Sequence, residues 1–193
     1  MISRLEITIT VSIGILLWLG LCVWGNVSPL DFKESLKLIT SSGVIVYFGR
    51  LIYFKWFWKY PPFNYAHKMP VLEGVWTGKL ISDYKQEETG TLIEKDIKVI
   101  ISQPDISNVF VKQVSDESFS KSYADSVVVD EHNDILLTYS YLNEPNADVR
   151  HRSEISFGSV RLSMDSKNSV ELKGNYWTDR KTRGRMILVK TKG

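Results

Sequence analysis

The densest group of chemically versatile side chains lies near the end of the chain, in the segment 174–185. Its sequence is GNYWTDRKTRGR, so two adjacent aromatic residues, Tyr176 and Trp177, precede three arginines. The guanidinium fork of arginine matches the geometry of phosphate, and aromatic faces stack on nucleobases. The combination is typical of a site for a small nucleotide. The alternative is a hairpin with aromatic packing and a solvated basic turn.

Charge is divided unevenly along the 193 residues, although the net charge is only +2. Residues 1–70 hold seven basic and three acidic side chains, residues 71–146 hold six and fourteen, and residues 147–193 hold eleven and five. The basic C-terminal quarter is therefore the first place to look for an anionic ligand. A basic face turned towards acidic lipid is the other interpretation, and the sequence leaves both open.

Catalytic signatures are missing from the chain. We find no nucleophile elbow, no Walker loop, no metal-binding His-Glu helix and no glycine-rich dinucleotide loop. The three histidines, His67, His132 and His151, lack metal-ligand spacing, and the single cysteine, Cys22, rules out an internal disulfide. We therefore expect a protein that is not an enzyme and that holds neither cofactor nor metal, with a membrane-bound hydrolase of unrecognised site as an alternative.

Two apolar stretches fill the first sixty residues. The first, 7–24, carries no charge, and the second, 38–58, is interrupted only by Arg50 and Lys55. Each is about as long as a helix that crosses a hydrocarbon core of about 30 Å. The predicted organisation is two transmembrane helices at about 7–25 and 37–58 within residues 1–60, a linker at 61–70, and a soluble domain at 71–193.

The first helix is expected to be retained, because its apolar core is too long for a signal peptide and no Ala-x-Ala site follows it. Basic residues near the helix ends set the orientation. Lys33 and Lys37 in the connection are partly offset by acids, whereas Lys55, Lys59 and Lys68 lie on the distal side. This bias places both termini, and the soluble domain, in the cytoplasm. Arg50 is expected to snorkel to that interface, with a functional role at membrane depth as the alternative.

Alternation with a period of two recurs throughout the rest of the chain, without a competing amphipathic helix. Short polar turns separate the segments, except for the connection 144–154. Eight strands joined in this way predict a compact, eight-stranded antiparallel up-and-down β-barrel, in which closure removes the exposed strand edges. The expected strands are 75–84, 92–103, 108–115, 119–130, 135–143, 155–165, 170–178 and 185–190.

The inward-facing positions change in character along the strands. They are apolar at one end and become tyrosine, asparagine and threonine at the other, as on the face shared by Leu137, Tyr139, Tyr141 and Asn143. This gradient predicts a barrel with a packed floor and a polar, aromatic mouth. A lipocalin-like, membrane-anchored binder of an apolar small molecule is an alternative for such a fold.

The first predicted strand opens with Gly74-Val75-Trp76, which resembles the Gly-x-Trp start of lipocalin-type barrels. In those barrels an arginine near the last strand covers the tryptophan. The resemblance therefore implies that Arg183 or Arg185 covers Trp76.

The whole arrangement resembles the transmembrane β-barrel effectors of bacterial CBASS antiphage systems. The resemblance covers the hairpin through Trp58, the Gly-x-Trp opening, and the Tyr-Trp-Thr-Asp-Arg-Lys-Thr-x-Gly run at 176–184. It implies that the barrel binds a cyclic dinucleotide made by a partner synthase. It further implies that receptors self-associate and that their clustered helices disrupt the lipid bilayer of the inner membrane, where the chain is a multi-pass protein. DNA and RNA polymers are not expected as partners.

The expected contacts to the ligand are chosen by facing and by chemistry. Tyrosines supply stacking faces, asparagine and threonine supply hydrogen bonds, and arginines supply phosphate contacts. Two arginines of the long connection are expected to serve as lids. The expected ligand-binding residues are Tyr139, Tyr141, Asn143, Arg150, Arg152, Tyr176, Thr178 and Arg180.

Overall fold

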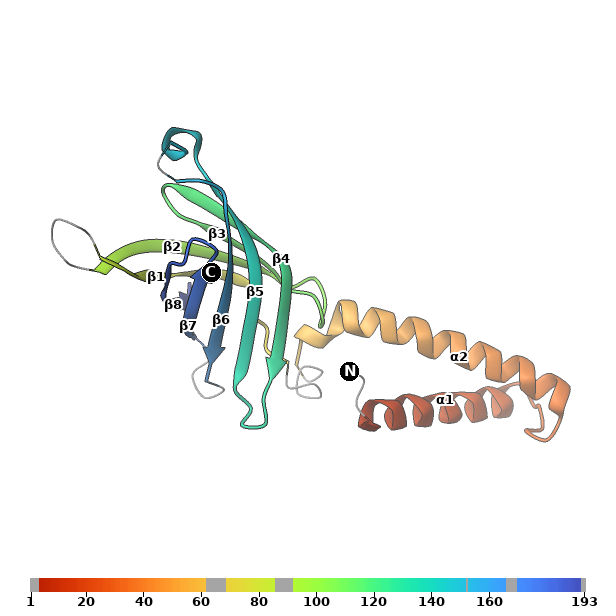
Figure 1. Cartoon of the computed structure of the whole chain (residues 1–193). Coiled ribbons are helices and arrows are strands. Elements are labelled where there is room, and N and C mark those ends of the chain that lie inside the picture. The colour runs from red at the N-terminus through yellow and green to blue at the C-terminus, as the bar shows by residue number, and fades with distance from the viewer. Residues whose placement is uncertain (1–3, 62–68, 86–91, 152, 166–169, 192–193) are drawn as a thin grey trace. The chain divides into compact units, whose positions relative to one another are not determined.

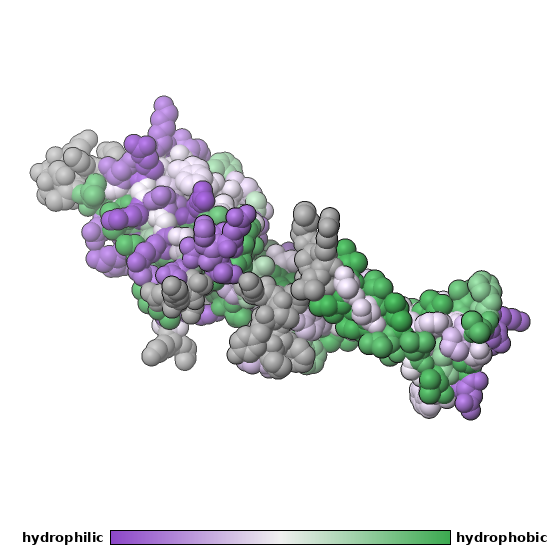
Figure 2. Space-filling model, turned by 90° about the horizontal axis from the view of Figure 1, so that it is seen from below, coloured by the Kyte–Doolittle hydropathy of each residue, from purple (hydrophilic) through white to green (hydrophobic). Residues whose placement is uncertain are grey.

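The computed structural model describes residues 4–61, 69–85, 92–151, 153–165 and 170–191. The chain forms two compact units, Met1–Trp58 and Lys59–Gly193. The first unit is helical and the second is a β-barrel (Figure 1). In Figure 2 the surface of the helical unit is largely hydrophobic, whereas the face of the barrel that is visible there is mainly hydrophilic.

The helical unit contains α1 (Arg4–Trp24) and α2 (Phe32–Lys55), and the short 3-10 helix η1 (Phe57–Lys59) follows. The carboxylate of Asp31 caps α2 by accepting the Glu34 backbone N–H at 3.4 Å. Both α-helices are long and apolar enough to cross a membrane, with mean hydropathies of 2.2 over Ile7–Trp24 and 1.2 over Phe32–Lys55. They are candidate membrane spans.

Arg50 joins the two helices instead of standing alone in an apolar surface. Its Nη1 atom donates to Oγ1 of Thr10 at 2.8 Å, and its guanidinium carbon lies 4.9 Å from the ring centroid of Phe54. Small residues are buried elsewhere in the pair, namely Ser35 and Ser42 of α2. Small side chains at such positions let helices approach closely.

Eight antiparallel strands close into a barrel in sequence order, which confirms the predicted fold. The strands agree with the expected ranges to within two residues at every end. A 3-10 helix, η3 (Ala147–Val149), lies in the long connection between the fifth and sixth strands. The strands are β1 (Gly74–Lys85), β2 (Leu92–Ser102), β3 (Phe110–Val114), β4 (Ser118–Val129), β5 (Ile135–Pro145), β6 (Ser156–Met164), β7 (Glu171–Thr178) and β8 (Arg183–Lys190).

The up-and-down order gives the barrel two distinct ends. The β3–β4, β5–β6 and β7–β8 connections gather at one end, which we call the mouth. The β2–β3, β4–β5 and β6–β7 connections lie at the other end, which we call the floor, and the chain enters β1 there at Gly74. Residues 69–73, which precede β1, therefore lie at the end opposite the mouth.

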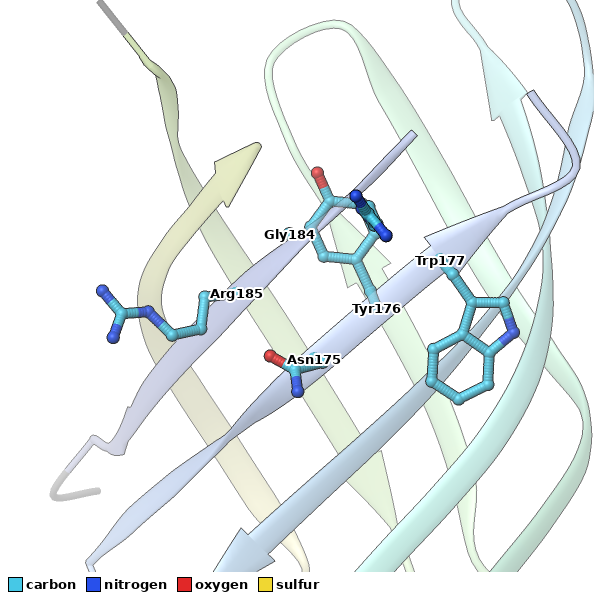
Figure 3. A pocket seen from close by; sticks show the side chains of 6 residues that line it. Asn175, Tyr176, Trp177, Gly184 and Arg185 are labelled. Atoms are coloured by element: carbon cyan, nitrogen blue, oxygen red, sulfur yellow. The ribbon is translucent and has the colours of Figure 1, made fainter. Parts of the chain in front are cut away.

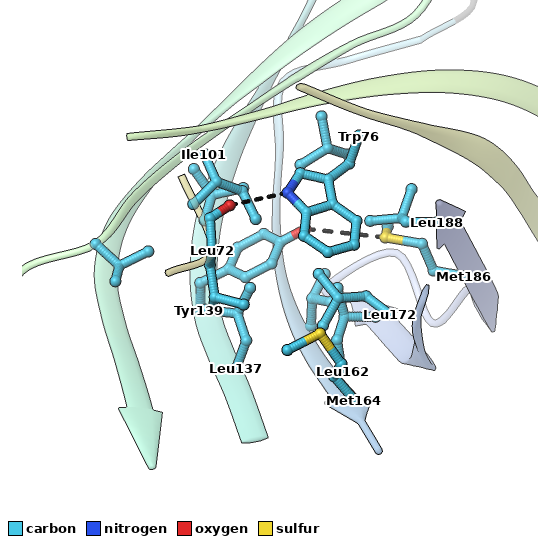
Figure 4. Packing of buried hydrophobic residues seen from close by; sticks show 14 of the residues in the cluster. Leu72, Trp76, Ile101, Leu137, Tyr139, Leu162, Met164, Leu172, Met186 and Leu188 are labelled. Carbon is cyan, nitrogen blue, oxygen red and sulfur yellow. Dashed lines mark hydrogen bonds between the residues drawn. The ribbon is translucent and has the colours of Figure 1, made fainter. Parts of the chain in front are cut away.

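Apolar side chains fill the barrel towards the floor (Figure 4). Tight interdigitation of this kind makes the floor a packed core instead of a channel. The predicted gradient from an apolar end to a polar end is thus present. The apolar residues with no exposed surface are Leu72, Trp76, Val99, Leu137, Val160, Leu162, Leu172 and Leu188.

The segment before β1 is tied to the floor. The Leu72 N–H donates to Oε1 of the fully buried Gln103 at 2.9 Å, and the Leu72 carbonyl accepts from Nε1 of Trp76 at 2.9 Å (Figure 4). Gln103 Nε2 also donates to the Pro70 carbonyl at 3.2 Å. Because both polar atoms of this buried amide form hydrogen bonds with the backbone of the segment, Gln103 fixes the segment to the barrel.

The expectation that an arginine covers Trp76 is wrong. The register of β1 against β8 places Trp76 opposite Lys190, whose Nζ lies 5.5 Å from the indole ring and donates to the Val71 carbonyl at 3.0 Å. Arg185 lies opposite Ile81, and Arg183 binds Asp83 at the other end of the strand pair. Lys190 covers Trp76 because it is the last residue of β8 and pairs with Trp76 across the two strands.

Candidate functional site

Three tyrosines line the barrel between the floor and the mouth. Tyr139 and Tyr141 lie two positions apart on the inward face of β5, with ring centroids 6.1 Å apart, and Tyr176 faces them from β7. Their side chains are buried, with 2%, 8% and 5% of their surfaces exposed. Tyr139 and Tyr176 lie in one cross-strand row through Val160 of β6. Sequence reasoning named all three, and the barrel brings them together.

Burial keeps these phenols neutral. It raises the pKa of Tyr141 to about 12, with smaller contributions from the negative charge of ionised Tyr176 and of Asp179. Burial also raises the pKa of Tyr139, and it raises that of Tyr176 despite a hydrogen bond with Ser82 that acts in the opposite direction. The Tyr139 hydroxyl donates to Sδ of Met186 at 3.9 Å within the core. Tyr141 and Tyr176 therefore offer O–H groups, which donate to anions, and no phenolate that would repel them.

Smaller polar side chains lie in the row of Tyr141 and in the next row towards the mouth. Asn143 is half-buried on β5, and its Oδ1 accepts from the Ser120 hydroxyl at 2.9 Å. Thr178 is half-buried at the end of β7, where its hydroxyl meets that of Thr182 at 2.7 Å and closes the β7–β8 hairpin. Both face inward, as expected, and Ser156 of β6 lies buried beside Asn143.

The arginines lie at the rim, outside the barrel. Arg180 is exposed and holds the β5–β6 connection: its Nη2 donates to the Glu154 carbonyl at 2.6 Å and its Nη1 to the Ser153 hydroxyl at 3.3 Å. Arg150 is exposed, and its Nε donates to the Pro145 carbonyl at 3.2 Å. Arg152 lies outside the described residues. Of the three arginines expected to bind the ligand, the structure describes Arg150 and Arg180, and it separates both from the inward-facing tyrosines.

Four further inward positions belong to the same rows and were not among the expected ligand contacts. Ser82 and Ser120 supply hydroxyls, while Gly158 and Gly184 stand opposite Tyr141 and Tyr176. The serines carry a sequence signal, because they alternate with outward residues on predicted strands. The glycines do not, since only the register of neighbouring strands shows which ring lies opposite each of them.

The conspicuous 174–185 segment divides between two faces. Tyr176 faces the interior, whereas Trp177, Arg183 and Arg185 are exposed on the outside of β7 and β8. Figure 3 shows Tyr176 and Trp177 directing their rings to opposite sides of the strand. One contiguous stretch therefore contributes to two separate surfaces.

The fold class is a closed antiparallel β-barrel with one packed end and one polar, aromatic end, an arrangement that can hold a small ligand. Among the residues that the structure describes, no group of three or more His, Cys, Asp or Glu side chains could hold a metal ion. A model of the Cap15 cyclic dinucleotide receptor domain matches residues 67–190, and the chain belongs to this family. The chain is also similar to a CD-NTase-associated protein 15 of Staphylococcus schleiferi, with 29% identity over 157 residues that cover 81% of each protein.

Proposed function

We propose that this chain is a membrane-anchored receptor of bacterial antiphage defence, and that its barrel binds a cyclic dinucleotide at the mouth. The proposal depends on one observation: the polar, aromatic rows lie inside a domain that belongs to a cyclic dinucleotide receptor family. The name of the staphylococcal relative associates that protein with a CD-NTase. A partner synthase that supplies the nucleotide follows from this association. The chain itself acts as a receptor and not as an enzyme.

The chemistry of the mouth suits such a ligand. The neutral phenols of Tyr141 and Tyr176 offer stacking faces and O–H donors. Thr178 adds a hydroxyl in the row of Tyr141, and Asn143 adds an amide in the next row towards the mouth. Phosphate oxygens accept from these donors, and bases stack on the rings. Arg180, on the rim, adds a cation that can turn inward once the ligand displaces its bonds to the β5–β6 connection.

The helical unit is the output element in this proposal. Both candidate spans cross the inner membrane, with the two termini and the barrel in the cytoplasm. Ligand-bound barrels self-associate, and the tethered helices then cluster at high effective concentration and disrupt the bilayer. The Arg50–Thr10 hydrogen bond places a cation between two apolar helices. We expect the helix pair to rearrange at this bond when the helices cluster.

Calorimetry tests the binding step. The full chain in nanodiscs is titrated with a panel of cyclic dinucleotides, and we expect one of them to bind. Tyr141→Ala and Tyr176→Ala should weaken binding by roughly 5- to 150-fold, since a stacked base contributes about 1–3 kcal/mol. Tyr123→Ala is the matched control, because Tyr123 is exposed on β4. If a folded barrel binds no cyclic dinucleotide but binds a fatty acid, the apolar-ligand alternative replaces this proposal.

Dye entry into cells tests the output step. Co-expression with the synthase should permeabilise the inner membrane, and Tyr176→Ala should prevent this at equal protein levels. The nucleotide recovered from the purified complex should be intact, because a receptor does not consume its ligand. Toxicity that persists in both tyrosine variants would contradict the assigned site.

A further inference from the structure

The outward half of the 174–185 segment takes no part in the proposed nucleotide site. An open hollow of about 450 Å³ at β7 and β8 is lined by Asn175, Trp177, Arg183 and Arg185, together with Tyr176 and Gly184, which lie between them along the strands (Figure 3). The register pairs Asn175 with Arg185 and Trp177 with Arg183, so the four side chains form a compact square across the two strands.

Neighbouring residues of β6 extend this surface. Arg161 lies opposite Asn175 and is exposed, and Phe157 lies two positions from the partner of Trp177. Trp177 and Phe157 are both large apolar rings with about half of their surface in solvent, 48% and 54%. We call this surface the outer wall; it comprises Phe157, Arg161, Asn175, Trp177, Arg183 and Arg185.

The outer wall carries more positive than negative charge. Arg183 pairs with Asp83, with Nε 2.9 Å from the carboxylate, and Lys173 beside the wall pairs with Glu171 at 2.8 Å. Arg161 and Arg185 form no ion pair with any residue that the structure describes. Two guanidinium groups thus remain available to an external anion beside two exposed aromatic rings.

This combination fits an anionic membrane surface. Tryptophan and phenylalanine are favoured at the boundary between headgroups and acyl chains, and arginine is attracted to acidic lipids. The same chain carries two candidate membrane spans, and the stretch 59–71 can hold the barrel no more than about 45 Å away, at about 3.3–3.6 Å per extended residue. Such a tether makes even weak contacts effective.

We propose that the outer wall of β6–β8 rests on the anionic lipid surface of the membrane that holds the helices. The contact uses the outside of the barrel and leaves the mouth open. It divides the basic C-terminal segment between two roles, because Tyr176 faces the ligand space while Trp177, Arg183 and Arg185 face the lipid.

A fluorescent label on the full chain tests this contact. In a Cys22→Ala background, Asn175→Cys carries an environment-sensitive NBD group on the outer wall. The matched control is Lys112→Cys, which is exposed on the outward face of β3. Nanodiscs contain phosphatidylcholine alone or a mixture with phosphatidylglycerol, and no nucleotide is added. We expect blue-shifted, brighter emission at position 175 with phosphatidylglycerol only, reversal by high salt, and no change at position 112.

Charge reversal separates specific docking from crowding near the bilayer. Arg161→Glu combined with Arg185→Glu should abolish the response at position 175, with near-UV circular dichroism confirming that the barrel is folded. Equal emission in both lipid compositions, or an equal response at both positions, would overturn the proposal. In a separate arm, a cyclic dinucleotide is added to phosphatidylcholine nanodiscs. A response at position 175 to this nucleotide but not to phosphatidylglycerol would also overturn the proposal and assign the wall to the nucleotide. The lipid arms contain no nucleotide, so their outcome is independent of the proposed receptor function.

Discussion

Tyr141 of β5 occupies the space that a side chain on Gly158 of β6 would need. The two residues are cross-strand partners, and a Cβ atom on Gly158 would lie 2.4 Å from both Cζ and Oη of the tyrosine. A Cβ atom on Gly184 of β8 would meet the backbone carbonyl oxygen of Ile81 first, and it would also lie 2.8 Å from Cε1 of its cross-strand partner Tyr176. Packing an aromatic ring over a cross-strand glycine is a recurrent device in curved sheets. The two rings of the mouth are therefore positioned by glycines on the neighbouring strands.

Gly158→Ala should displace the Tyr141 ring. Adding a methyl group to a packed interior typically costs about 1–3 kcal/mol of unfolding free energy. A ring moved into the ligand space should also weaken cyclic dinucleotide binding by roughly tenfold or more, or about 1.4 kcal/mol. Urea unfolding and calorimetry measure the two effects on the same protein.

A double-mutant cycle isolates the contact from other effects of the new methyl group. In a Tyr141→Ala background the ring is gone, so Gly158→Ala should cost much less stability than in the wild type. Equal costs in both backgrounds would show that the methyl group clashes with something other than the ring.

The three buried tyrosines should make the barrel sensitive to alkali. Burial raises the folded-state pKa of Tyr141 from 10.0 to about 12. Below pH 10 the phenol is neutral in both states, so the contribution is fully present; above pH 10 only the unfolded state ionises, and stability falls. For Tyr141 alone the loss approaches roughly 2–3 kcal/mol near pH 12. Urea unfolding between pH 8 and 11.5 should show a shallower decline in Tyr141→Phe than in Tyr123→Phe, and identical profiles would contradict this.

The barrel and the tyrosine rows were predictable because both depend on alternation along single strands. The period of two on β5 and β7 fixes which side Tyr139, Tyr141 and Tyr176 face, and short polar turns fix the neighbours of each strand. The floor follows from the same pattern, since its apolar residues share faces with these tyrosines.

The contacts that sequence reasoning missed depend on how distant segments meet. Lys190, instead of Arg183 or Arg185, covers Trp76 because barrel closure sets the register of β8 against β1. Arg180 binds the β5–β6 connection because the β5–β6 and β7–β8 connections both lie at the mouth of the barrel. The local pattern of one strand encodes neither the register between strands nor the contacts between neighbouring connections.

Gln103 should be important for holding the segment before β1 on the barrel. Gln103→Leu conserves volume but leaves the buried Leu72 N–H without its acceptor, which costs about 1–3 kcal/mol. Urea unfolding should report this loss, and hydrogen exchange should rise in the peptide that contains Leu72. Ser102→Ala, at an exposed neighbouring position, should change neither quantity. Unchanged exchange at Leu72 in Gln103→Leu would contradict the assigned restraint.

Arg180 should act as a latch between the β7–β8 hairpin and the β5–β6 connection. Its guanidinium group holds the Glu154 carbonyl and the Ser153 hydroxyl, while Asp179 separately accepts the Phe157 N–H at 3.1 Å. Arg180→Ala removes the first restraint only. Because the arginine is exposed, we expect a cost of about 1 kcal/mol, or roughly fivefold faster hydrogen exchange in the 146–155 connection.

The matched control for the latch is Lys181→Asn, which removes the adjacent positive charge. Lys181 has a φ of 64°, a conformation that asparagine tolerates, so the hairpin should keep its shape. This variant should leave exchange in the connection at the wild-type rate. Equal acceleration in both variants would mean that charge near the rim, and not the Arg180 hydrogen bonds, restrains the connection. If the latch must open for the ligand, Arg180→Ala should also speed nucleotide association in stopped-flow measurements while Lys181→Asn does not.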